Sequence, residues 1–70
     1  MSQADYQKAL KQIETGDLAG SLQRLDRILK KNPKFAQAYP PRAQVRAKLQ
    51  DLKGAIADYK EAMRLQPTAM

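Results

Sequence analysis

The chain repeats itself with a period of 34 residues, and this repeat limits its possible folds more than any other feature. Pro33 and Pro67 lie one period apart. A repeat of this length usually means stacked helical units, each burying its apolar face against the next. We therefore treat the chain as one domain of residues 1–70, with unit 1 at about 2–35 and unit 2 at about 36–69. The same shift aligns these further identical pairs: Gln3 and Gln37, Ala4 and Ala38, Ala9 and Ala43, Asp17 and Asp51, Leu18 and Leu52, Gly20 and Gly54.

Each unit contains the pattern of a helix, a short turn and a second helix. Apolar residues recur at helical spacing, most clearly in the stripe Leu18, Leu22, Leu25, Ile28 and Leu29. Turn residues separate the helices, and an aspartate follows each turn as an expected N-cap. The sequence predicts an all-α fold of four helices, near residues 2–15, 17–31, 40–50 and 52–66, packed as successive antiparallel hairpins.

Two adjacent prolines, Pro40 and Pro41, interrupt the start of unit 2. Proline is tolerated in the first turn of a helix, where the amides have no intrahelical partner, but not deeper. We therefore predict that regular helix begins near residue 40 and that residues 34–39 are partly extended or irregular. The expected consequence is a loose joint at residues 34–41, through which hairpins could be exchanged between chains.

The period and the hairpin pattern resemble the tetratricopeptide repeat, whose consensus is W-x2-L-G-x2-Y…A-x3-F…P. Unit 2 carries the resemblance best, with Tyr39 at the Trp place, and Ala55, Tyr59 and Pro67 at the Ala, Phe and Pro places. Its arginines resemble those of a bacterial variant of the repeat. Unit 1 departs further, because Asp5, Lys8, Gln12 and Ser21 replace the residues at four consensus places.

The resemblance implies an α-α superhelix that binds other proteins. It also suggests that Arg46 pairs with Asp58 across the second hairpin. The alternative is that two exposed charges meet there by chance. In this family the first helix of each unit lines a concave binding surface. The implied contacts with a peptide or helical segment, for which an acidic partner is favoured, are Tyr6, Leu10, Ile13, Glu14, Arg42, Gln44 and Lys48. The stripe Tyr6, Leu10 and Ile13 is also what an ordinary buried helix face would contain.

Residues for catalysis are scarce. The chain has no histidine and no cysteine, which removes the commonest general base, disulfides and the usual zinc ligands. No glycine-rich phosphate loop is present. We therefore expect a protein that is not an enzyme and has no cofactor or metal. The N-terminal residues lack the features of a secretory signal, and no apolar run is long enough to span a bilayer, so we expect a cytoplasmic protein.

A net charge of +6 raises nucleic acid as an alternative partner. The charge is spread evenly, however, because residues 1–34 contain seven Lys and Arg against four Asp and Glu, and residues 35–70 contain six against three. A helical hairpin that binds nucleic acid or a ribosomal surface is therefore the second hypothesis, after protein binding.

Two repeats leave one helical face uncovered. Arrays of this kind generally need about three units and a polar capping helix. In unit 2 we expect Ile56, Met63 and Leu65 to have no successor to cover them. We therefore expect a homodimer, formed by packing these faces together or by exchanging hairpins. The alternative is that the chain is an excerpt of a longer array.

Overall fold

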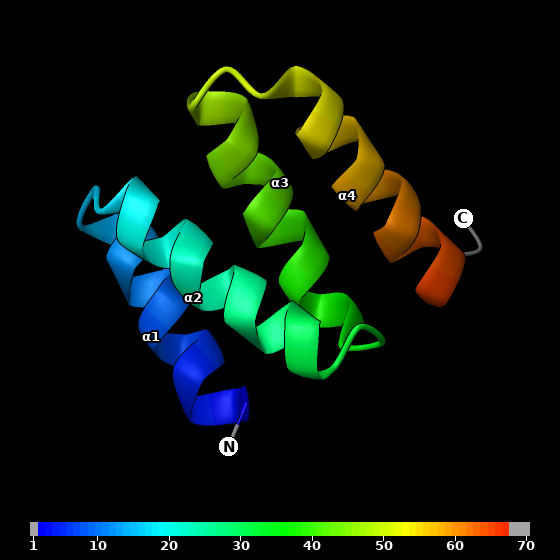
Figure 1. Cartoon of the computed structure of the whole chain (residues 1–70), viewed down its shortest axis with the longest axis horizontal. Coiled ribbons are helices and arrows are strands. Elements are labelled where there is room, and N and C mark those ends of the chain that lie inside the picture. Colours follow the sequence, from blue (N-terminus) through cyan, green and yellow to red (C-terminus); the bar gives the residue numbers. More distant parts are fainter. Residues whose placement is uncertain (1, 68–70) are drawn as a thin grey trace.

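The computed structural model describes residues 2–67, which form two helical hairpins and contain no strand (Figure 1). The four α-helices are α1 (Ser2–Glu14), α2 (Leu18–Lys31), α3 (Tyr39–Lys48) and α4 (Leu52–Leu65), and a short 3-10 helix, η1 (Ala36–Ala38), precedes α3. The all-α prediction is confirmed, and each helix lies within two residues of its predicted bounds. The predicted end of unit 2, at residues 68 and 69, lies outside the described residues.

Equivalent turns close the two hairpins. The carboxylate of Asp17 accepts a hydrogen bond from the Gly20 amide at 3.0 Å, and Asp51 does the same for Gly54 at 3.0 Å. Both predicted N-caps are therefore confirmed; each satisfies an amide that has no partner within its helix. The residue before each aspartate has a left-handed backbone, with φ of 89° at Gly16 and 72° at Gln50.

The joint between the units is ordered around two tyrosines. Regular helix begins at Tyr39, one residue before the predicted start, with the prolines in its first turn. The stretch predicted to be irregular contains the 3-10 turn of η1. The Tyr39 hydroxyl donates to the Pro33 carbonyl at 2.6 Å, and the Tyr6 hydroxyl donates to the Gln37 carbonyl at 3.1 Å. Because Tyr39 is also buried, these contacts do not support the loose joint that we expected.

The core lies between the two hairpins and continues into the second one. Leu25, Ile28 and Leu29 of α2 pack with Ala38 and Tyr39 from the joint. Small side chains let helix axes approach closely. As a result α3 lies between α2 and α4 and packs on both (Figure 1). The small buried residues that occupy equivalent places in the two units are Ala9 and Ala43, and Ser21 and Ala55.

Among the described residues, none of the helices combines the length and the apolar character that crossing a bilayer requires.

Candidate functional site

A cluster of four charged side chains joins α2, α3 and α4. Asp58 is only 2% exposed and accepts hydrogen bonds from Arg42 Nε at 3.0 Å and Arg42 Nη2 at 2.7 Å. Arg46 Nη1 donates to the same carboxylate at 3.3 Å. Arg42 also reaches Asp26 of α2 at 3.0 Å. The predicted pairing of Arg46 with Asp58 is therefore confirmed, and it belongs to a larger network.

The network keeps Arg42 charged and fixed. Burial lowers the pKa of Arg42, but hydrogen bonds and charge from Asp58, followed by those from Asp26, outweigh it and raise the pKa above its ordinary value. The guanidinium also lies 5.4 Å from the centre of the Tyr39 ring, within the range of a cation–π contact. The polar atoms of Arg42 are therefore engaged within the fold, and its assignment to the partner-binding surface stays a prediction.

The remaining residues of the predicted concave surface are not equally available. Tyr6 is partly buried and packs edge-on against Phe35, with ring centres 5.4 Å apart. Leu10 and Ile13 are half-buried. Of the predicted contacts, solvent reaches three freely, which are Glu14 of α1 and Gln44 and Lys48 of α3.

The largest exposed apolar side chains of the described residues lie mainly on α4. Leu52, Ile56, Tyr59 and Met63 follow one another at helical spacing, so they share one side of the helix. We call these four residues the α4 face. Leu49, directly after α3, is also exposed.

The same positions in unit 1 are better covered. A shift of 34 residues places the α4 face on Leu18, Leu22, Leu25 and Leu29 of α2. Tyr59 is 42% exposed and Met63 is 66% exposed, but Leu25 is fully buried and Leu29 is 5% exposed. The difference arises because unit 2 packs on α2, whereas within residues 2–67 no further helix follows α4. The α4 face therefore has the composition of a core surface in an uncovered position.

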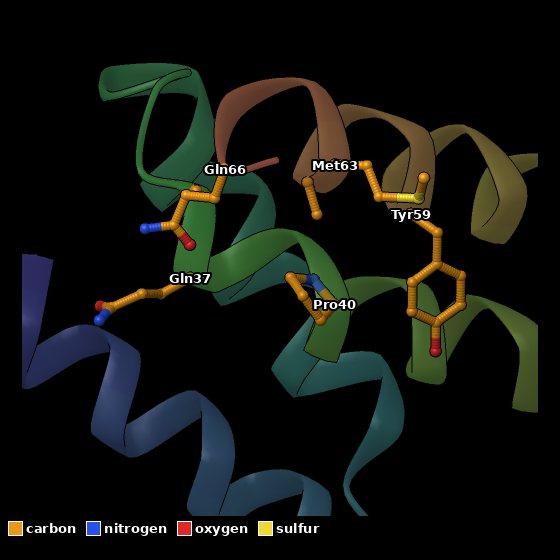
Figure 2. A pocket seen from close by; sticks show the side chains of 7 residues that line it. Gln37, Pro40, Tyr59, Met63 and Gln66 are labelled. Carbon is orange, nitrogen blue, oxygen red and sulfur yellow. The ribbon is translucent and has the colours of Figure 1, made fainter. Parts of the chain in front are cut away.

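A groove of about 280 Å³ borders the α4 face. Figure 2 shows Tyr59 and Met63 of α4 beside Pro40 of α3, with Gln37 and Gln66 at the other end. Small-molecule sites usually span about 300–1,000 Å³. The volume of this groove is close to the lower end of that range. Its lining consists of Ala36, Gln37, Pro40, Tyr59, Ala62, Met63 and Gln66.

The residues predicted for self-association differ in their exposure. Ile56 and Met63 are exposed, as predicted, but Leu65 is partly buried against the core. Leu52 and Tyr59, which we did not assign to self-association, are exposed on the same helix. The 34-residue shift contained the information needed to find them, because both align with apolar residues of the α2 stripe. Within residues 2–67, no group of three or more Asp or Glu residues is placed to hold a metal ion.

Compared with known proteins, the chain matches no family model, no curated protein and no solved structure. Its function therefore has to be inferred from the α4 face and the groove beside it.

Proposed function

We propose that this protein is an interaction module of two tetratricopeptide-type hairpins that binds a helical segment of another protein through the α4 face. The observation that carries the proposal is the contrast between α2 and α4, whose equivalent apolar side chains are covered in one unit and exposed in the other. Isolated exposed apolar residues are common on protein surfaces, but contiguous ones often mark sites of interaction.

Burial of these side chains provides the driving force for binding. Complete burial of a large apolar side chain is worth about 1.5–3 kcal/mol relative to full exposure. The four residues of the α4 face are each about half exposed or more, so covering them would contribute several kcal/mol. This gain has to exceed the loss of translational and rotational freedom on association. An exposed apolar helix face with a groove beside it is suited to an amphipathic helix.

The proposal can be tested by selecting binders from a library of amphipathic helical peptides against the immobilised chain. Amide chemical shift changes in the labelled protein then locate the bound peptide. We expect changes centred on Ile56 and Met63, and loss of binding in Met63→Glu. The matched control is Leu10→Glu, which adds the same charge to the concave surface; circular dichroism checks that both variants remain helical.

Other results would assign the function elsewhere. Loss of binding in Leu10→Glu alone would move the site to the concave surface. If no helical peptide is selected but RNA or heparin binds with a steep dependence on salt, the nucleic-acid hypothesis replaces this one. Sedimentation of the free chain tests the predicted homodimer. A dimer that Met63→Glu converts to a monomer would show that a second copy occupies the α4 face.

A further inference from the structure

The joint between the units shows how this fold covers a surface like the α4 face. Shifting the groove residues Tyr59, Ala62 and Met63 back by 34 positions gives Leu25, Ile28 and Leu29. Those three residues pack with Ala38 and Tyr39 of unit 2. The groove is therefore the open counterpart of the place where unit 1 receives a small residue followed by an aromatic one.

The apolar part of the occupant follows from this comparison. In the joint, Phe35 packs edge-on against Tyr6, and Tyr6 is the counterpart of Pro40 in the groove. An occupant that repeats this arrangement has an aromatic residue, a small residue three positions later and a second aromatic residue directly after it. Gln37 and Gln66 at the end of the groove offer amide groups to a tyrosine hydroxyl.

At the place that Arg42 holds in α3, the occupant requires a residue of the opposite charge. In the joint, Arg42 of α3 pairs with Asp26 of α2 at 3.0 Å. The counterpart of Asp26 on α4 is Lys60, which is exposed and has no ion pair within the described residues. A carboxylate at the Arg42 place, three positions after the second aromatic residue, would therefore meet a cation. Lys53 lies two helical turns before Lys60 on the same side of α4 and extends the positive edge.

A second copy stacked in the same manner does not meet these requirements. The counterpart of α3 in such a copy is α1, which has Asp5 at the Tyr39 place and Lys8 at the Arg42 place. Asp5 would enter an apolar groove, and Lys8 would face Lys60. Burial of an unpaired charge and contact between like charges are both unfavourable. Head-to-tail association of the chain through this face is thus disfavoured.

We infer that the groove and the α4 face receive an acidic amphipathic helix of a partner protein, with the pattern aromatic-x-x-small-aromatic-x-x-Asp or Glu. The inference rests on the proposed function and adds the chemistry of the partner to it. It requires both an apolar anchor in the groove and a carboxylate opposite Lys60.

The probe is a synthetic peptide of residues 35–49 of this chain that carries Arg42→Glu and a label for fluorescence anisotropy. The matched control is the same labelled peptide with Arg42 retained. We expect the substituted peptide to bind about tenfold more tightly than the control at low salt, which corresponds to about 1.4 kcal/mol. This difference should shrink as salt is added, because salt screens the attraction to Lys60.

Two further variants separate the charge from the apolar anchor. Lys60→Glu in the full chain should reverse the preference between the two peptides. Adding Tyr39→Ala to the substituted peptide should weaken its binding at least about tenfold, since this change removes the aromatic anchor. Chemical shift changes at the Met63 methyl rather than at the methyls of Leu25 establish that the peptide occupies the groove and has not displaced α3.

Equal affinity of the two peptides, no reversal in Lys60→Glu, or no binding of either peptide would overturn the inference. Failure here is distinguishable from failure of the proposed function, because library peptides that lack this pattern but bind the α4 face would leave the proposed function intact.

Discussion

Removal of the Asp58 carboxylate is the most informative perturbation of the fold. Asp58 is nearly inaccessible and accepts three hydrogen bonds from two arginines. Removing one partner of a buried ion pair typically costs about 3–5 kcal/mol. Arg42 would retain Asp26 at 3.0 Å, and Arg46 would retain Asp51 at 3.8 Å, so neither guanidinium would be left alone. We therefore expect Asp58→Ala to cost about 3 kcal/mol, the lower end of that range.

This loss is large for a chain of this size, because the whole free energy of unfolding of such a domain is about 3.5–10 kcal/mol. Urea denaturation followed by far-UV circular dichroism measures it, and the thermal midpoint should fall by roughly 12–24 °C. The control is Glu14→Ala, which changes the net charge equally but removes an exposed carboxylate 4.0 Å from Lys11. We expect that control to stay within about 0.5 kcal/mol of the parent. A similarly small effect of Asp58→Ala would refute the assignment of Asp58 as the centre of the network.

Two further predictions concern a turn and the surface of α4. Gln50 has a left-handed backbone that its counterpart Gly16 adopts without strain. The substitution Gln50→Gly should therefore raise the free energy of unfolding, measured by urea denaturation, by about 0.5–1 kcal/mol. A loss of stability would show that the Gln50 side chain compensates for the strain. The hydrogen bond from Arg64 lowers the pKa of Glu61, so an NMR titration should give a midpoint below the ordinary glutamate value, and Arg64→Ala should restore it. Since the folded-state pKa of Glu61 is lowered, the small stabilisation from this pair is present above the ordinary glutamate pKa and is lost as the pH falls through the folded-state pKa. An unchanged midpoint in Arg64→Ala would show that Arg64 is not the cause of the lowered pKa.

The helices were predictable because local features agreed with the repeat. Aspartate caps, turn residues and prolines mark the helix ends independently of any contact between the units. Even the unusual start of α3 followed from elementary chemistry, since two adjacent prolines fit only the first turn of a helix.

The surroundings of α3 were harder to predict because this helix packs on both neighbours. Arg42 lies where α2 and α4 both approach, and periodicity alone did not indicate that its partners would be Asp26 and Asp58. The partial burial of Leu65 was also not predicted. The end of α4 packs near η1, and Leu65 is partly buried against the core. Both features depend on contacts between elements, which a pattern along one helix does not contain.

The position of Arg42 also affects how the chain unfolds. Repeat proteins often lose one unit at a time, because each unit contacts only its neighbours and can melt separately. Here one guanidinium on α3 is bound by carboxylates of α2 and α4. Melting of the second hairpin would take Arg42 away from Asp26 and would expose the apolar side of α2 at the same time. The two hairpins are thereby coupled, and denaturation should proceed in one cooperative transition with no stable half-folded chain.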